Sequence, residues 1–425
     1  MFHIKYYHPS APKESWWSGF DQAQELEKFK QTIHSKEIGF FRLPLESHFS
    51  EESISLYEKI IKSRTIKHFV HLGIGGSSLG PELLVKSLRD YDHSTKFHFI
   101  NNIDPDAIWE ILQQIDVEQT LFFVVSKSGG TAEIVSGLSL IYQFLIEKGL
   151  KEKEARALFA FCTDPLEGDL LAIAKDWDVP YLTIPQDVGG RYCVLSSVGL
   201  FPALFAGLDI QRLLLGAKKM AEEILETPSH ENELITLAGL LYSLKKEGIT
   251  QTVLMPYSSK LREISFWFSQ LWSESLGKKH NKNGIEVFEG LTPLVSYGAT
   301  DQHSQMQLFM HGPKDKCLLF LEVEQFDHDF SLKNSISGKT FEKLSPFTLS
   351  QLMKAELMGT VKALEKEARP YAHLVLPKRD EFHLGALILL LESLTVLTGQ
   401  LLNVDPFDQP GVEQGKIFAY EFLGE

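Results

Sequence analysis

The chain has 425 residues, of which 44% are hydrophobic and 23% charged, and its formal net charge is −14. This composition is close to that of ordinary globular proteins, which excludes a disordered, collagen-like or coiled-coil chain. The length predicts about two or three domains that each bury a core. The negative balance argues against nucleic acid or an anionic membrane surface as the main partner.

Neither the N-terminus nor the cysteine pattern indicates export. The N-terminal residues contain no apolar run followed by a small-residue cleavage pattern, so no signal peptide is predicted. The most apolar stretch, residues 384–397, is interrupted by Glu392, and we expect it to be too short and too polar to span a bilayer. Three widely spaced cysteines predict neither a disulfide framework nor a zinc site and favour a cytoplasmic location. They are Cys162, Cys193 and Cys317.

After an aromatic N-terminal segment (residues 1–44), strand-like runs alternate with helical stretches. The runs are residues 67–74, 96–102, 120–126, 157–163 and 180–185. One of the intervening helices is predicted to begin at Asp104, as an N-cap before Pro105. Continuous apolar strands that alternate with helices are typical of a parallel sheet covered on both faces. We therefore predict an open α/β domain over residues 45–207.

Residues 208–248 are predicted to form two helices that connect this domain to a second one. A new α/β series then occupies residues 249–425. Its predicted elements are strands at 251–258, 292–298 and 316–326 and helices at 261–277, 345–367 and 381–402. The chain is predicted to end in a loop and a short helix.

Two loops after predicted strands are rich in small and hydroxyl-bearing residues. In open α/β sheets, ligands bind beyond the carboxyl ends of the strands, where these loops lie. Loop 73–80 (GIGGSSLG) has Ser78 where the dinucleotide fingerprint needs a third glycine, so that cofactor site is rejected. Loop 126–131 (SKSGGT) places three hydroxyls before a helix N-terminus, which favours a phosphate. A polar turn with an N-cap serine is the structural alternative.

Three further polar residues are candidates, each with an ordinary alternative. Arg191 follows a glycine pair in loop 187–191 and is placed either to stabilise an anion or to act as a surface cation. Glu274 is four residues from Lys278, so spacing alone favours an ion pair on a helix. His303 stands at an expected helix start, where a lone histidine more often makes a structural hydrogen bond.

Two other kinds of site are rejected. Residues 411–416 (GVEQGK) are similar to a P-loop, but only three residues separate the glycines, and Ile417 follows Lys416 in place of Ser or Thr. The chain has neither an H-E-x-x-H motif nor a carboxylate-rich calcium loop, so no metal is predicted.

In combination, six motifs are more specific than any one of them. In chain order they are GIGGSSLGPE, SKSGGTAE, DVGGRY, QLWSESLGK, TDQHSQ and QPGVEQGK. This series resembles the signatures of the phosphoglucose isomerases (glucose-6-phosphate isomerases), and the length is similar to that of the shorter bacterial members. The resemblance covers residues from about His71 to Lys416. It implies two sugar-isomerase-type three-layer αβα domains with mainly parallel sheets, in agreement with the pattern of strands and helices.

The resemblance also implies a reaction. Glucose 6-phosphate and fructose 6-phosphate are interconverted through ring opening and an enediol, in glycolysis and gluconeogenesis, without a metal or organic cofactor. Phosphate binding would involve Gly76, Ser77, Ser126, Lys127, Ser128 and Thr131. Catalysis would involve Glu274 as the base between C2 and C1, Arg191 beside the enediolate, His303 and Lys416 in ring opening, and Gln270 and Gln409 along the sugar. Because the partner subunit provides the histidine in this family, a homodimer is implied.

A few positions depart from the family pattern. Gly130 stands where a second threonine is usual, Cys193 where serine is common, and Gln186 and Pro410 where other residues are frequent. None is a presumed acid, base or enediolate-stabilising residue. Two alternatives remain: a sugar-phosphate-sensing protein of the same fold, and an isomerase for a related substrate such as mannose 6-phosphate.

Overall fold

The computed structural model describes residues 2–333 and 336–424, and the chain divides into two compact units. The 31–222 unit comprises Gln31–Glu222 and Asp380–Leu389. The 223–425 unit comprises Glu223–Arg379, Leu390–Glu425 and Met1–Lys30. Each of the two α/β series predicted from the sequence provides the sheet of one unit, and the predicted α/β class with mainly parallel sheets is confirmed.

The sheet of the 31–222 unit has five parallel strands in the order β3-β2-β4-β5-β6. The strands are β2 (His68–Leu72), β3 (Lys96–Ile100), β4 (Thr120–Ser126), β5 (Phe159–Thr163) and β6 (Tyr181–Thr183). All five lie within the predicted runs. Strands β2, β4 and β5 are buried along their whole length, as expected where helices cover both faces of a parallel sheet.

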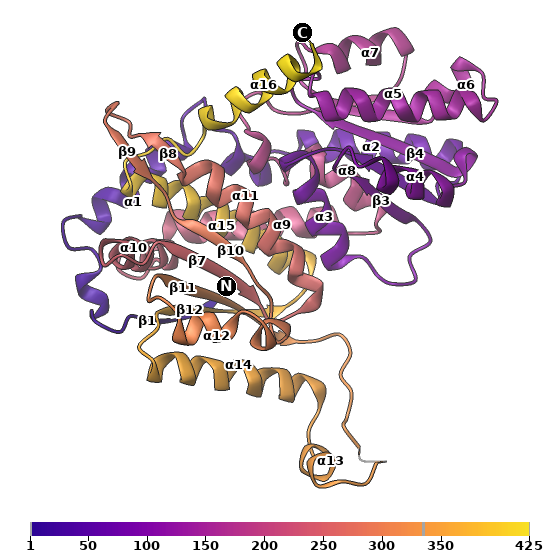
Figure 1. The fold of residues 1–425 in the computed structure, drawn as a ribbon. Helices are drawn as coiled ribbons and strands as arrows, with labels where there is room; N and C mark the ends of the chain where they lie inside the picture. Colours follow the sequence, from indigo (N-terminus) through magenta and orange to yellow (C-terminus); the bar gives the residue numbers. More distant parts are fainter. Residues whose placement is uncertain (1, 334–335, 425) are drawn as a thin grey trace. The chain divides into compact units, whose positions relative to one another are not determined.

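Alternate side chains of β4 contact the two helical layers of this unit. Phe122 and Val124 belong to a core with residues of α4, α5 and α7, whereas the ring of Phe123 lies 4.8 Å from that of Phe201 in α8. Figure 1 shows α5 and α7 together on one side of the sheet. The helices are α2 (His48–Ser63), α3 (Gly76–Leu88), α4 (Pro105–Gln114), α5 (Ala132–Glu147), α6 (Glu152–Arg156), α7 (Asp169–Trp177), α8 (Ser197–Phe205) and α9 (Ile210–Glu226), with short η2 (Phe40–Leu45), η3 (Val117–Gln119) and η4 (Gly190–Tyr192).

The sheet of the 223–425 unit has the order β1-β12-β11-β7-β10. Its strands are β1 (His3–Tyr7), β7 (Gln251–Pro256), β10 (Thr292–Val295), β11 (Lys316–Gln325) and β12 (Tyr371–Lys378), and a separate hairpin is formed by β8 (Lys278–His280) and β9 (Glu286–Glu289). Four strands are parallel, and β1 pairs antiparallel with β12. The sequence left the role of the N-terminal segment open, and the structure uses its first strand as the edge of this sheet.

Helices α12 and α14 cover one face of this sheet, and α11 packs on β7 and β10 from the other (Figure 1). Ser265 of α11 donates to the carbonyl oxygen of Leu254 at 3.0 Å, which fixes the helix on the sheet. The helices are α1 (Gln22–Ile33), α10 (Glu233–Lys246), α11 (Arg262–Leu276), α12 (Met306–His311), α13 (Lys339–Leu344), α14 (Leu349–Lys366), α15 (Glu381–Leu401) and α16 (Glu413–Leu423), with short η1 (Lys13–Ser15), η5 (Ser259–Leu261), η6 (Thr300–His303) and η7 (Pro410–Val412).

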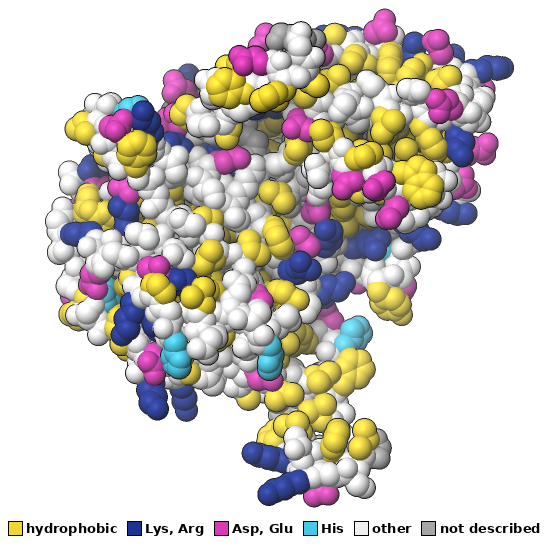
Figure 2. All heavy atoms as spheres, viewed as in Figure 1, with side chains coloured by type: hydrophobic (Ala, Val, Ile, Leu, Met, Phe, Trp, Pro, Cys, Tyr) yellow, Lys and Arg dark blue, Asp and Glu magenta, His cyan; other side chains and the backbone are white. Residues whose placement is uncertain are grey.

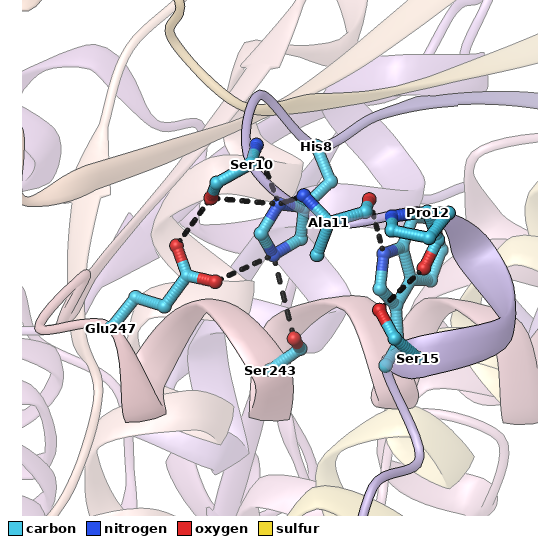
Figure 3. Close-up of polar contacts among 8 residues, drawn as sticks. His8, Ser10, Ala11, Pro12, Ser15, Ser243 and Glu247 are labelled. Atoms are coloured by element: carbon cyan, nitrogen blue, oxygen red, sulfur yellow. Dashed lines mark hydrogen bonds and ion pairs between the residues drawn. The ribbon is translucent and has the colours of Figure 1, made fainter.

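The segment after β1 is fastened to α10 through His8 (Figure 3). Nδ1 of this imidazole accepts from the backbone N–H of Ala11 at 3.1 Å, and Nε2 lies 3.4 Å from the hydroxyl of Ser243. Ser10 donates to the Glu247 carboxylate at 2.6 Å. The N-terminal residues are therefore an ordered part of the 223–425 unit.

Helix α15 is long and apolar enough to cross a membrane by length and composition alone. However, 94% of its most apolar window is buried within the structure, as in the core helix of a water-soluble protein. This burial agrees with the expectation from the sequence that the stretch does not span a bilayer.

A pair of histidines on neighbouring strands predicts an acid-sensitive fold. Nδ1 of His68 and Nε2 of His98 lie 3.1 Å apart, and burial, His68 and Lys96 lower the pKa of His98 to about 4. An unfolded histidine titrates near 6.5, so the unfolded chain binds more protons between these values. We expect the free energy of unfolding to fall as the pH falls from about 6.5 to 4. Chemical unfolding across this range should show a shallower fall for His98→Phe; equal slopes would contradict the assignment.

Candidate active site

In both sheets, later strands of the chain are added on both sides of the first parallel strand, so the strand order reverses there. In the 31–222 unit, β3 lies on one side of β2, and β4 and then β5 and β6 lie on the other. In the 223–425 unit, β10 and β11 flank β7 in the same manner. The carboxyl ends of strands at such a reversal leave a crevice where ligands bind in open α/β folds. Loops 73–77 and 126–131 follow the two strands at the first reversal, β2 and β4.

Loop 73–77 packs directly on the segment that contains Arg191. A Cβ atom added to Gly76 would lie 2.0 Å from the carbonyl oxygen of Gly190 and 2.7 Å from the nitrogen of Arg191. Only glycine allows this approach of two backbones. Gly75 has φ +58°, and it turns the chain into α3, so that Ser77 lies in the first turn of that helix. The structure thus brings Gly76, Ser77 and Arg191 together.

The hydroxyl groups of loop 126–131 converge at the start of α5. Oγ1 of Thr131 lies 3.3 Å from both Oγ of Ser126 and Oγ of Ser128. Thr131 is the N-cap residue of α5 and makes no side-chain capping bond, so its hydroxyl is directed to this cluster. Three hydroxyls and the N-terminus of a 16-residue helix form an arrangement suited to an anion.

Gly129 gives the same loop its shape. It has φ +74°, and an added Cβ would lie 2.8 Å from the backbone nitrogen of Asp169 at the start of α7. Its N–H donates to Oγ of Ser126 at 3.1 Å. Gly130, which replaces the usual second threonine, is exposed. Glycine in place of threonine at residue 130 therefore removes one hydroxyl group, while the turn itself is formed by Gly129.

Lys127 binds the neighbouring loop that contains Gln186 and Val188. Its Nζ donates to the carbonyl oxygens of Gln186 and Val188 at 2.8 and 3.0 Å. Burial lowers the pKa of this half-buried ammonium. The side chain therefore holds the segment that leads to Arg191, an interaction that its position in the motif alone did not indicate.

Residues in and just before η2 also contact the segment that leads to Arg191. The N–H of Gly39 donates to the carbonyl oxygen of Asp187 at 2.8 Å, and the Asp187 carboxylate pairs with Arg42. Arg191 itself is buried, with its guanidinium 5.5 Å from the centre of the Tyr192 ring. Neither Gly39 nor Arg42 is predicted from the sequence, because residues 39–42 (GFFR) match no known motif and only the fold brings them to this loop.

Cys193 also contacts the loop that contains Ser77. Its Sγ lies 3.7 Å from the carbonyl oxygen of Gly76, within the range of a thiol hydrogen bond. A cysteine can therefore donate where serine is common in the family. The departure at this position does not remove the contact between the two segments.

In the 223–425 unit, Glu274 lies in the last turn of α11, as predicted. Its Oε1 accepts from Nε2 of Gln270 at 3.1 Å, and the side chain is partly exposed. Lys278 lies beyond the helix, in β8, and its Nζ donates to the main-chain carbonyls of Glu274 and Asp408 at 2.5 and 3.0 Å. The ammonium thus caps the end of α11 and ties it to the segment that continues into Gln409.

His303 and Lys416 lie on exposed parts of the same unit. His303 is the last residue of η6, and its side chain is exposed. It therefore lies at the end of a 3-10 turn and before α12, not at a helix start. Lys416 is on α16, where its Nζ lies 2.8 Å from the Glu413 carboxylate in an exposed ion pair. Such a pair is weak, so Lys416 can exchange it for another anion.

The two sets of residues offer different chemistry. Hydroxyls, a helix N-terminus and a guanidinium are suited to an anionic group, and a carboxylate with an amide neighbour is suited to proton transfer. Among residues 2–333 and 336–424, no three His, Cys, Asp or Glu side chains are grouped to hold a metal ion.

The phosphoglucose isomerase family model matches residues 47–425. The chain belongs to this family. A glucose-6-phosphate isomerase of Carboxydothermus hydrogenoformans is 38% identical over 94% of this chain and 88% of the relative. One of Thermus thermophilus is 37% identical over 84% of each chain. The resemblance inferred from the six motifs is confirmed.

Solved structures agree with the fold. A hypothetical protein from Thermus thermophilus is 33% identical, with a TM-score of 0.90 over the whole of both chains. A glucose-6-phosphate isomerase from Chlamydia trachomatis is 24% identical, with a TM-score of 0.83 over all of this chain and 88% of that one. At 24% identity, the similarity to the Chlamydia trachomatis structure supports the fold alone.

Because the backbones of Gly76 and Gly190 approach so closely, a methyl group added at residue 76 is expected to reduce activity strongly. We expect Gly76→Ala to separate loop 73–77 from the Arg191 segment and to lower kcat/KM roughly a hundredfold, since a misplacement of about 1 Å has that effect. Gly189→Ala is the matched control, because its Cβ would lie 3.7 Å from Tyr192, an ordinary contact. Steady-state isomerase assays of both variants are the measurement. Near-normal activity of Gly76→Ala would show that the contact is dispensable.

Proposed function

We propose that the chain interconverts glucose 6-phosphate and fructose 6-phosphate through ring opening and an enediol intermediate, in glycolysis and gluconeogenesis. Membership of the phosphoglucose isomerase family over residues 47–425 carries this proposal. The site supports it, because an anion-binding loop cluster and a carboxylate base occur in one chain. The names of the relatives favour glucose 6-phosphate as substrate.

The phosphate group is proposed to bind in the 31–222 unit. The hydroxyl of Thr131 lies 3.3 Å from the hydroxyls of both Ser126 and Ser128, and the helix N-terminus adds a favourable dipole. Ser77 and the Gly76 backbone are proposed to donate from the first turn of α3. Lys127 is proposed to help by bracing the loop, because its ammonium already binds two carbonyl oxygens. A remote phosphate anchors the sugar and orients its reacting end.

Glu274 is proposed to move the proton between C2 and C1. The substrate carbonyl acidifies the neighbouring C–H bond, so one carboxylate on one face can remove the proton and return it to the adjacent carbon. The enediolate carries negative charge on oxygen, and the buried Arg191 guanidinium is proposed to stabilise it. Gln270 holds one Glu274 oxygen at 3.1 Å, which orients the base.

Ring opening requires an acid and a base at O5 and O1 of the sugar. His303 and Lys416 are proposed to fill these roles, and Gln409 is proposed to line the sugar with Gln270. Lys278 supports this arrangement, since it joins the end of α11 to Asp408, the residue before Gln409. The proposed mechanism needs no metal or organic cofactor.

A cytoplasmic homodimer is proposed as the working form, with His303 acting in the site of the partner subunit. Helix α16 supports an interface between copies because it carries a run of exposed apolar side chains, visible in Figure 2. These side chains are Ile417, Phe418, Tyr420, Phe422 and Leu423. The exposed position of His303 is compatible with a role outside its own subunit.

The two alternatives are less well supported. A sugar-phosphate-sensing protein needs the phosphate loops but not Glu274, His303 and Lys416 together. An isomerase for mannose 6-phosphate needs all of them, so this activity is distinguished only by an assay with both sugars. Assays in EDTA test the cofactor-free mechanism, because a metal-dependent enzyme would lose turnover.

The proton-transfer role predicts a variant that binds but does not react. We expect Glu274→Gln to lower kcat by roughly 10²- to 10⁴-fold, the range of general base catalysis, with nearly unchanged affinity for fructose 6-phosphate. A coupled assay gives kcat, and calorimetry gives the affinity. Ser273→Ala, at the neighbouring exposed position of α11, is the control and should stay active. Full activity of Glu274→Gln would remove this residue from the mechanism.

The shared site predicts complementation between two inactive variants. In a mixed dimer of Glu274→Gln and His303→Ala, one site receives both substitutions and the other receives neither. Random assortment gives half mixed dimers, so about a quarter of the wild-type activity should return after co-expression or subunit exchange. If His303 acts within its own subunit, each active site of the mixed dimer contains one of the two substitutions, and no activity returns.

A further inference from the structure

The first turn of α3 contains a backbone carbonyl that cannot make its usual helical bond. In an α-helix the carbonyl of Ser77 accepts from the N–H of the residue four positions later. That residue is Pro81, inside α3, and proline has no N–H. A buried carbonyl without a donor is costly, so a donor from elsewhere in the fold is expected.

His71 on β2 provides that donor. Its Nε2 lies 2.6 Å from the Ser77 carbonyl oxygen. A carbonyl only accepts hydrogen bonds, so Nε2 carries the proton and the tautomer is fixed. The imidazole is fully buried, with the rings of Phe99 and Phe123 at 5.5 and 5.6 Å. No other partner is found for Nδ1 among the residues that the structure describes.

The surroundings keep the imidazole neutral and in place. Burial lowers the pKa of His71 to about 4, because the charged imidazolium would lose its hydration; the bond to the Ser77 carbonyl and the Glu82 charge oppose this shift only in part. Gly73 leaves the space for the contact, since a Cβ there would lie 2.7 Å from the Ser77 carbonyl oxygen and 2.9 Å from Nε2 of His71. The donor is therefore available at any pH used for assays near neutrality.

We propose that His71 is a positioning residue for phosphate binding, which replaces the missing N–H of Pro81 and so fixes the Ser77 peptide in the first turn of α3. His71 does not touch the substrate. It acts through Ser77, whose backbone and hydroxyl form one side of the phosphate site. This inference rests on the proposed function, in which Ser77 binds the phosphate group.

Substitutions of His71 can separate the effect of its hydrogen-bond donor from the effect of its side-chain volume. His71→Phe fills the space without a donor. It should raise KM for fructose 6-phosphate and Ki for inorganic phosphate roughly tenfold, the effect of losing one hydrogen bond between Ser77 and the phosphate. The value of kcat should stay within about twofold. His71→Gln keeps a donor and should fall close to wild type. His98→Phe replaces a partly buried histidine on the neighbouring strand β3, which contacts His68, and is the control for general destabilisation.

A second substitution should restore the bond chemically. Pro81→Ala returns an N–H to residue 81, so the double variant His71→Phe with Pro81→Ala should regain most of the lost phosphate affinity, while Pro81→Ala alone changes little. Unchanged KM and Ki in His71→Phe, equal defects in His71→Phe and His71→Gln, or no rescue by Pro81→Ala would each overturn the proposal.

Folding failure is also informative. If His71→Phe does not fold, the double variant should fold, because the carbonyl again has a donor; a double variant that also fails to fold counts against the proposal. Absence of isomerase activity in the wild-type protein would instead overturn the proposed function. The two failures are therefore distinguishable.

Discussion

The 31–222 unit depends on the approach of two backbones at Gly76 and Gly190. A single methyl group at residue 76 would lie 2.0 Å from the opposing carbonyl oxygen. This contact places the first turn of α3 beside Arg191, and other interactions secure the same segment. Lys127 binds the carbonyls of Gln186 and Val188, and Arg42 pairs with Asp187. A flexible glycine-rich sequence is thereby held in one conformation, as a preorganised anion site requires.

The 223–425 unit uses the same topology for a different purpose. Strands β10 and β11 flank β7 in its sheet, and α11 begins shortly after β7 and carries Glu274 in its last turn. The end of this helix is capped by Lys278, whose ammonium also binds the Asp408 carbonyl. The Lys278 ammonium also lies 3.5 Å from the Asp408 carboxylate, and Gln270 donates to the Glu274 carboxylate at 3.1 Å. The net charge of −14 is compatible with an anionic substrate, because a few local donors decide binding.

The fold was largely predictable because the strands of the first sheet are continuous apolar runs bounded by glycine or helix-capping residues. The cap at Asp104 was also predictable, and its carboxylate accepts from the N–H groups of Asp106 and Ala107. The antiparallel strand β1 was not, since its pairing with β12 joins residues more than three hundred positions apart. Likewise, spacing favoured an ion pair between Glu274 and Lys278. Lys278 stands past the end of α11, and its ammonium donates to the main-chain carbonyls of Glu274 and Asp408, two contacts that the spacing did not indicate.

The motif residues could be listed from the sequence, but not the residues that hold them. Gly39, Arg42 and His71 belong to no recognised pattern, and each makes a long-range contact that only the folded chain creates. Pro81 can be recognised in the sequence: a proline beyond the first turn of a helix leaves a carbonyl four residues earlier in need of a donor. Which side chain fills that need depends on the packing of β2 against α3, which no local pattern specifies.

In the proposed reaction the phosphate binds at loops 73–77 and 126–131, and Glu274 faces the carbons that exchange the proton. The decisive measurement is a crystal structure of the protein with bound fructose 6-phosphate. We expect phosphate oxygens within hydrogen-bond distance of Ser77, Ser126 and Thr131, and a Glu274 oxygen beside C1 and C2. A phosphate bound elsewhere, or a Glu274 carboxylate remote from both carbons, would contradict this proposal.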